Sequence, residues 1–258
     1  MNVSAAPKAT PIRCAMFPSP YSGDPWNRMH PLLSELATRL IELGCECVPT
    51  PDFPSWRWLM ANRGKVDVIH LHWPELHYAR PDEQGLLWCL GAGPLRVLRM
   101  HGLIRLWRLR WLYGFFAIAR RLRIPVVWTM HDLYPHGFTP QDRPRAEYVA
   151  RRYLMRHASA VILNGASAEA PAVAEFGRPR RLFVAPLGDY QRWYPDTLSD
   201  EEARRAMALE PGERVFLYFG TMRPRRNPLK LIEHFRALPQ ENLRLLVSGE
   251  CPEALRRQ

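Results

Sequence analysis

The chain has 258 residues, a hydrophobic fraction of 47% and a charged fraction of 24%. This composition is that of a globular protein with a sizeable core, and it excludes a chain that is disordered throughout. A net charge of +11 and a pI near 9.9 favour anionic partners such as phosphates, nucleic acid or a membrane surface. No nucleic-acid partner is expected, because the sequence has no zinc-ligand spacing, no RNP-like aromatic motif and no short basic arm.

The cysteines and the N-terminus point to a reducing compartment. The five cysteines, an odd number with no C-x-x-C pair, are expected to be reduced core residues. Residues 1–10 contain no apolar stretch of the kind that a signal peptide has. The most apolar segment, 98–122, is interrupted by six arginines, which a membrane span would not tolerate. We therefore expect a cytoplasmic protein that is soluble or peripheral at the inner face of the cytoplasmic membrane.

Apolar runs alternate with helical patterns along most of the chain. In order, the sequence predicts a strand at 12–17, a helix at 28–43, a strand at 45–49, a connection rich in proline and tryptophan, a strand at 66–72, one or two helices at 95–122, a strand at 124–130, a helix at 143–156, a strand at 160–163, a helix at 168–176 and a strand at 181–185. Near-continuous apolar strands in such an alternation favour a parallel sheet covered by helices on both faces, the doubly wound α/β class.

Three parts follow one another in this pattern. Residues 1–190 are predicted to form one Rossmann-like domain, and residues 191–211 a linker with a helix that begins in a capping box of Ser199 and Glu202. Residues 212–258 repeat the pattern once, as a strand at 215–219, a helix at 228–237 and a strand at 243–247. A domain typically needs roughly 100 residues to bury its own core. We therefore expect residues 212–258 to be an incomplete second domain.

Polar and aromatic residues follow four of the predicted strands at the point where each ends. Ligands bind beyond the carboxyl ends of the strands in open parallel sheets, so these residues are expected to converge on one rim. His131 is the leading candidate, because it is the first polar residue after an apolar strand and Asp132 follows it directly. The other candidates are Tyr21, Trp26, Asn27, Arg28, Trp73, Glu75, His136 and Ser167.

The histidines have other interpretations. His70 alternates with His72 along one strand, so one of the two is expected to face the core, and His70 is taken as structural. His72, His131 and His136 also suggest a metal site, but their spacing is not that of a metal motif, and no metal is predicted. Each tryptophan and tyrosine, taken alone, also fits ordinary packing.

A second candidate site lies in residues 212–258. Gly220 ends a predicted strand and is followed by Arg223, by Arg226 and then by the start of a helix. Backbone N–H groups, the helix dipole and guanidinium groups all favour a bound phosphate at such a place. A solvated basic turn is an equally good interpretation of the same residues.

Four motifs in order give the chain a resemblance to bacterial retaining glycosyltransferases of family 4, in the branch associated with exopolysaccharide assembly. They are D-P-W-N-R at 24–28, V-I-H-L-H-W-P-E at 68–75, V-V-W-T-M-H-D-L-Y-P-H at 126–136 and Y-F-G-T-M-R-P-R-R-N at 218–227. The resemblance covers essentially the whole chain. It implies a GT-B architecture of two Rossmann-like domains, in which 1–190 is the acceptor side and 212–258 the first part of the donor side, with the active site between them.

The resemblance also implies roles for the candidate residues. His131, with Asp132 beside it, would contact the transferred sugar, and Gly220, Arg223 and Arg226 would hold the diphosphate of a nucleotide-sugar donor. The residues at the other strand ends would bind the acceptor, a glycan or a polyprenyl-diphosphate-linked glycan. No metal or cofactor is implied, because cationic side chains stabilise the leaving nucleotide and the nucleotide sugar is itself a substrate.

Several departures from the family pattern bear on activity. Arg226 stands where the family has lysine, Arg225 where it has tyrosine, and Leu187 where a histidine often lies. The family's E-x7-E segment, which grips the sugar and the ribose, lies beyond the last residue of this chain. A C-terminally truncated donor domain is therefore expected.

Three functions are compatible with these observations. The first is transfer of a sugar from a nucleotide sugar in polysaccharide biosynthesis, by this chain alone or as one half of a split transferase with a complementary donor-domain chain. The second is a non-catalytic module that binds a glycan or a lipid-linked acceptor. The third, nucleic-acid binding, rests on charge alone and is least favoured. The sequence leaves open whether the chain is an enzyme by itself.

One basic stretch has two interpretations of its own. Residues 96–123 are rich in arginine and tryptophan, which suits contact with an anionic membrane surface. Apolar residues nevertheless recur there at helical spacing, which favours a core helix with arginines at its solvent edge. These apolar residues are Leu103, Trp107, Trp111 and Phe115.

Overall fold

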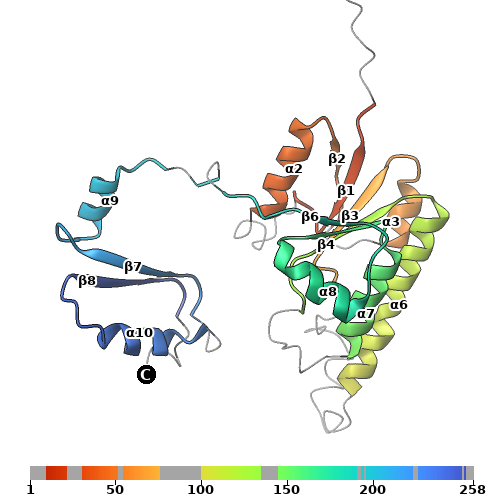
Figure 1. Ribbon diagram of the computed structural model, residues 1–258. Coiled ribbons are helices and arrows are strands. Elements are labelled where there is room, and N and C mark those ends of the chain that lie inside the picture. The colour runs from red at the N-terminus through yellow and green to blue at the C-terminus, as the bar shows by residue number, and fades with distance from the viewer. Residues whose placement is uncertain are drawn as a thin grey trace, which may run out of the picture. The chain divides into compact units, whose positions relative to one another are not determined.

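The chain divides into two compact units, residues 1–194 and residues 195–258. The computed structural model describes residues 10–21, 31–51, 55–75, 100–134, 145–190, 193–194, 196–222, 226–251 and 253, the side chains of 100–108 excepted. Each unit contains a parallel sheet with helices beside it (Figure 1).

Six parallel strands form the sheet of the first unit, in the order β2-β1-β3-β4-β5-β6. The order reverses between β1 and β3, and such a reversal is the point at which doubly wound sheets bind their ligands. The predicted α/β fold with a parallel sheet is thereby confirmed. The strands are β1 (Arg13–Phe17), β2 (Glu46–Val48), β3 (Val68–His72), β4 (Val126–Met130), β5 (Ala160–Leu163) and β6 (Leu182–Val184).

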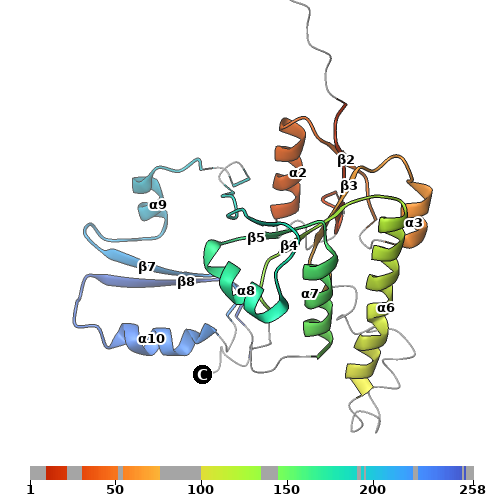
Figure 2. The same ribbon diagram turned by 45° about the vertical axis from the view of Figure 1, so that its right-hand side comes forward.

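One face of this sheet carries the main core of the unit. Four helices pack on this face, and α6 contacts both α3 and α7 (Figures 1 and 2). Trp128, Phe115 and Leu154 lie at the centre of this core, each exposed by 1% or less. Burying a side chain of this size contributes roughly 1.5–3 kcal/mol. The helices are α3 (Trp56–Ala61), α6 (Met100–Arg121), α7 (Arg145–His157) and α8 (Glu169–Phe176).

The opposite face carries α2 (Leu32–Glu42) and is more polar. Side chains alternate along a strand, so Cys14 and Met16 point to this face and pack with α2. Over β3 and β4 the same face holds His70, His72 and Thr129, all buried. The near-continuous apolar pattern predicted for β3 and β4 is therefore interrupted on the side toward α2, where His70, His72 and Thr129 lie beside Val68 and Val127.

The connection after β2 contains a helix that we did not predict. Ser55 begins α3, and its hydroxyl accepts a hydrogen bond from the Trp58 backbone N–H at 3.1 Å. Leu59, on the inner side of α3, is 1% exposed. Trp58 also packs against the core, in an edge-to-face contact with Phe17, so a cap and two anchoring side chains hold a short helix in a segment predicted only as a connection.

The second unit is small. Its two parallel strands, β7 (Arg214–Phe219) and β8 (Leu243–Ser248), are accompanied by α9 (Asp200–Ala206) and α10 (Pro228–Arg236). The helix α9 begins with the predicted capping box of Ser199 and Glu202. Leu217 and Phe219 of β7 stay 63% and 77% exposed, so this unit buries little apolar surface of its own.

Candidate functional site

A cavity of about 320 Å³ lies where the strands of the first sheet end, and is named here the carboxyl-edge cavity. Its walls come from α2, from the ends of β3, β4 and β5, and from residues 185–190, which follow β6. This is the edge at which open parallel sheets bind their ligands. The polar side chains from the strand ends are His70, His72, Thr129, His131 and Asn164.

The register of the strands explains why these residues meet. Met130 of β4 pairs with Leu163 of β5, so the next residue of each strand, His131 and Asn164, leaves the sheet beside the other. His72 is the last residue of β3, the strand on the other side of β4. Three consecutive strands thus each deliver one polar side chain to the same place.

His131 is held by three of its neighbours. Asn164 Nδ2 lies 3.1 Å from His131 Nδ1, and His72 Nδ1 lies 3.0 Å from His131 Nε2. The indole of Trp73 stacks on the imidazole of His131, with 4.3 Å between ring centroids and 18° between ring planes. Because an amide nitrogen can only donate, His131 Nδ1 accepts, and the ring carries its proton on Nε2 and donates it to His72.

This arrangement also fixes the proton on His72. Its Nδ1 accepts from His131, so a neutral His72 carries its proton on Nε2. His72 is only 2% exposed, and no atom of the described residues is a hydrogen-bond partner for Nε2. A buried donor that lacks an acceptor costs about 1–3 kcal/mol. An oxygen of a ligand bound in the carboxyl-edge cavity would remove that cost.

Burial keeps the histidines of this cavity neutral. It lowers the pKa of His131 to about 4, with Arg151 lowering it as well and Asp132 opposing the shift. Burial also lowers the pKa of His70 to about 4, and the pKa of His72 falls well below its usual value. At neutral pH both ring nitrogens of His131 are therefore bonded and the ring is uncharged, which suits contact with a neutral polar ligand better than proton abstraction.

A buried arginine fixes the backbone beside His131. Arg151 of α7 is 2% exposed, and its Nη1 donates to the carbonyl oxygen of Asp132 at 2.8 Å. Its guanidinium lies 3.6 Å from Glu75 and 3.9 Å from Glu147. We predicted only a basic helix here. In the sequence, the only local sign of this buried cluster is a glutamate four residues before an arginine, within an otherwise apolar helix face.

Trp73 adopts a backbone conformation that is rare for an aromatic residue. Its φ is +44°, in the left-handed region that favours glycine. Residues held in this way cost of order 1–3 kcal/mol and cluster at functional sites. Here the strained backbone belongs to the residue whose ring stacks on His131.

The other predicted residues of the first unit lie apart from this cavity or outside the described residues. Tyr21 is 55% exposed, and Ser167 is exposed on η2 (Ala166–Ala168); neither lines the cavity. Glu75 faces Arg151. Leu187, which stands where the family often has histidine, does line the cavity. Trp26, Asn27, Arg28, His136 and Arg223 lie outside the described residues.

The expectation that only one of His70 and His72 faces the interior was wrong. Side chains two residues apart on a strand point to the same face, so both are buried, with their ring centroids 4.2 Å apart. His70 Nε2 lies 2.8 Å from Thr129 Oγ1, which agrees with the structural role that we expected for His70.

The second unit brings two strand ends into backbone contact. Gly220 follows β7 and Gly249 follows β8, with φ of +117° and +142°. A Cβ atom on Gly249 would collide with the carbonyl oxygen of Gly220, so only glycine permits this approach. Arg226 Nη1 would lie 2.9 Å from a Cβ on Gly220, so its guanidinium lies against Gly220. Sequence reasoning found Gly220 and Arg226 but missed Gly249, although a glycine follows both strands.

Comparisons with known proteins fit this arrangement. Residues 106–188 match the family model of Glycosyltransferase Family 4. The match includes His131, Arg151 and Asn164, and it extends from α6 to the segment after β6. The two ends of the chain fall outside the match.

Curated proteins with a similar sequence are also named as glycosyltransferases. The chain is 29% identical over 155 residues to a D-inositol 3-phosphate glycosyltransferase of Rhodococcus opacus, covering 54% of this chain and 34% of that protein. It is 25% identical over 202 residues to a GDP-mannose:glycolipid 4-beta-D-mannosyltransferase of Xanthomonas campestris pv. campestris, covering 77% of this chain and 45% of that protein. The chain therefore spans less than half the length of these relatives, and its sequence is glycosyltransferase-like.

Solved structures show the fold. Anabaena Alr3699/HepE in complex with UDP-glucose superposes with a TM-score of 0.53 at 15% identity, over 93% of this chain and 61% of that one. The same protein in complex with UDP gives a TM-score of 0.55 at 14% identity, over 96% and 63%. At this identity the likeness is one of fold: the chain has a parallel α/β fold of the GT-B type.

The described residues offer no candidate for a membrane-spanning helix or for a metal site. No helix in the described ranges is long and apolar enough to cross a membrane. No group of three or more His, Cys, Asp or Glu side chains in those ranges is arranged to hold a metal ion.

Proposed function

We propose that this protein serves in the transfer of a sugar from a nucleotide-sugar donor to a glycan or lipid-linked glycan acceptor, in polysaccharide biosynthesis. The observation that carries the proposal is the clamped, neutral His131 in the carboxyl-edge cavity, within the segment that matches Glycosyltransferase Family 4. The transferred sugar and the acceptor are assigned to this cavity.

A neutral cluster of this kind suits a sugar. Sugar hydroxyls are uncharged and both donate and accept hydrogen bonds, so they need directed partners rather than ions. The Nε2–H of His72 supplies a buried donor, and the indole of Trp73, stacked on His131, holds the imidazole that lines the cavity. We assign binding and orientation of the sugar to these three residues.

The diphosphate of the donor is assigned to the second unit. The guanidinium of Arg226 lies beside Gly220, and Arg226 directly precedes the N-cap of α10; a helix N-terminus and a guanidinium both favour a phosphate. In the proposed reaction the bond between the anomeric carbon and the diphosphate oxygen breaks, and an acceptor hydroxyl oxygen bonds to that carbon. In a retaining transfer the attack comes from the face that the diphosphate leaves, and the hydroxyl proton passes to the leaving phosphate oxygen.

The named substrates of the relatives support the choice of donor and acceptor classes. The Xanthomonas relative is named for GDP-mannose and a glycolipid, and the Anabaena protein was solved with UDP-glucose. A glycolipid acceptor would bring this chain to a membrane surface, in keeping with its net charge of +11. Arg223, Asp132 and the outlying acceptor candidates keep their predicted roles in this proposal.

Calorimetric titration with UDP and GDP tests the donor assignment. We expect micromolar binding of at least one of them, weakened about tenfold or more by Arg226→Ala, because a charge-assisted hydrogen bond contributes roughly 1.5–3 kcal/mol. Arg236→Ala, at the far end of α10, is the matched control and should leave binding unchanged. Absence of binding up to millimolar nucleotide with the chain folded, or equal losses in both variants, would overturn the donor site.

The transfer itself is tested by nucleotide release from UDP-glucose and GDP-mannose in the presence of a lipid-linked acceptor extract. A complementary donor-domain chain is added in a second arm. Release that falls at least tenfold in His131→Ala supports the proposal. Binding of the acceptor without release in either arm would show a non-catalytic binding module instead.

A further inference from the structure

A second pocket lies at the opposite edge of the same sheet. It has a volume of about 350 Å³ and is named here the amino-edge pocket, because β4 and β5 begin there. Its walls come from the C-terminal ends of α6 and α7 and from the segment that leads into β6. The assignment of the carboxyl-edge cavity leaves this pocket without a role.

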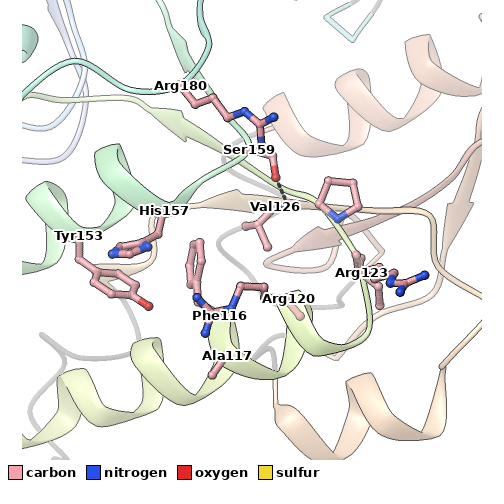
Figure 3. Close-up of a pocket in the computed structure, with 12 residues that line it drawn as sticks. Phe116, Ala117, Arg120, Arg123, Val126, Tyr153, His157, Ser159 and Arg180 are labelled. Carbon is pink, nitrogen blue, oxygen red and sulfur yellow. Dashed lines mark hydrogen bonds between the residues drawn. The ribbon is translucent and has the colours of Figure 1, made fainter.

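The amino-edge pocket is lined by cations. Arg120, Arg123 and Arg180 reach it from different segments, and His157 adds an imidazole. Figure 3 shows Arg120 and Arg180 on opposite sides of the pocket, with Arg123 at the end away from His157. Among the described residues no carboxylate lines the pocket, and none of the three arginines has an ion-pair partner.

Helix ends account for only part of this charge. Two helices, α6 and α7, end at the pocket, and cations near a helix C-terminus complement its dipole. Each helix end carries roughly half a negative charge, so the two contribute about −1 against three full positive charges. The carbonyls of the last turn of α6 are in addition already bonded, since Ile124 N–H donates to Ala119 and Arg123 N–H to Arg120. A positive excess of about two charges therefore faces the pocket.

One of the arginines occupies a position that favours glycine. Arg123 follows α6 with a φ of +59°, the left-handed conformation that ends many helices. A side chain other than glycine costs roughly 1 kcal/mol or more there. The chain keeps an arginine at this place, and its side chain lines the amino-edge pocket. Strain that is retained where a charged side chain enters a pocket is the pattern of a binding residue.

The remaining walls are aromatic and apolar. Tyr153 makes an edge-to-face contact with Phe116, at 5.5 Å between ring centroids, and lies 4.2 Å from the ring of His157. Val126 completes the apolar side (Figure 3). The pocket thus combines several guanidinium groups with a flat apolar surface.

We propose that the amino-edge pocket binds a phosphate monoester, with Arg120, Arg123 and Arg180 contacting the phosphate and Phe116 and Tyr153 contacting its organic group. Guanidinium groups match phosphate oxygens in geometry, and several of them supply the charge for a dianion. The site is separate from the carboxyl-edge cavity, because it lies at the other end of the strands.

Phenyl phosphate and inorganic phosphate, titrated at constant ionic strength and followed by protein NMR, test this inference. Both should bind saturably, and phenyl phosphate should bind several-fold more tightly because of the aromatic wall. Arg120→Ala and Arg123→Gly should each weaken the binding of phenyl phosphate about tenfold. Arg121→Ala, an exposed arginine of the same helix end that does not line the pocket, should change binding less than twofold.

Two results would overturn the proposal. One is binding of phenyl phosphate that does not saturate. The other is an equal loss of phenyl phosphate binding in Arg121→Ala and in the two pocket variants, which would show attraction to net charge alone. Arg123→Gly should remain folded, since glycine is favoured at that φ, so weaker binding by this variant would report the loss of the guanidinium group.

Vesicles that contain phosphatidic acid, whose headgroup is a phosphate monoester, distinguish a lipid headgroup from a soluble phosphate. Vesicle binding that phenyl phosphate displaces, and that Arg123→Gly weakens, would identify a lipid as the source of the same phosphate. The proposal would be overturned if neither phenyl phosphate nor Arg123→Gly weakened vesicle binding and phenyl phosphate itself did not bind.

Discussion

At the carboxyl edge of the first sheet the polar side chains from the strand ends are buried or half-buried and bonded to one another, whereas at the amino edge the arginines are exposed and have no ion-pair partner among the described residues. Both pockets have nearly the same volume, about 320 and 350 Å³. The first is preorganised, because each of its groups fixes the next, and it suits a neutral ligand that must be oriented. The second is lined by exposed arginines, so anion binding there should weaken strongly as the salt concentration rises.

The largest difference between the two edges should appear on removing one arginine from each. Arg151→Ala removes the cation of a buried cluster and the donor to the Asp132 carbonyl, so we expect a loss of about 3–5 kcal/mol in the free energy of unfolding. Arg120→Ala, at the amino edge, should cost less than about 0.5 kcal/mol. Urea unfolding measures both.

Arg152→Ala is the control for the large loss, since Arg152 follows Arg151 on α7 but is not buried. If Arg151→Ala cost no more than Arg152→Ala, the buried cluster would not stabilise the carboxyl edge.

A second difference should appear on acidification. Burial lowers the pKa of His131 and that of His70 to about 4, from 6.5 in the unfolded chain. Between pH 6.5 and 4 the unfolded state therefore binds more protons than the folded state, and stability falls as the pH falls. The stabilisation is complete above about pH 6.5. One shift of this size corresponds to roughly 3 kcal/mol.

Asn164→Asp sharpens this test. A carboxylate beside His131 Nδ1 favours the protonated ring, so the pKa of His131 should rise and the loss of stability between pH 6.5 and 4 should shrink. NMR of the imidazole nitrogens follows the pKa directly. A His131 that titrates near 6.5 in the unmodified chain would contradict the burial that we describe.

The smallest predicted effect concerns the strain at the amino edge. Arg123→Gly should stabilise the fold by up to about 1 kcal/mol, because it relieves a left-handed arginine. Arg121→Gly, in the last turn of α6, should instead destabilise by up to about 1 kcal/mol. Thermal unfolding of the pair tests the opposite signs, and two losses of equal size would show that Arg123 is not strained.

Local patterns in the amino-acid sequence predict much of the fold. Short apolar runs placed every strand of the first sheet, and Ser199 with Glu202 placed the start of α9, because these signals lie within a few residues of one another. The helix α3 was missed because its signal is one cap and one buried leucine. His131 and Gly220 could be selected because each follows a strand directly.

What only the tertiary structure decided is which of these residues meet. His131 contacts a residue 59 positions before it and another 33 positions after it, and those contacts depend on the register of three strands, which no local pattern contains. The burial of Arg151 and the positive φ of Arg123 were likewise invisible in a sequence where arginine is common. The sequence by itself determined most of the elements and the edge at which a ligand is expected to bind, since both follow from periodicity and strand direction. The clamp around His131 and the cationic pocket at the other edge follow from how distant elements pack, which is why only the folded chain shows them.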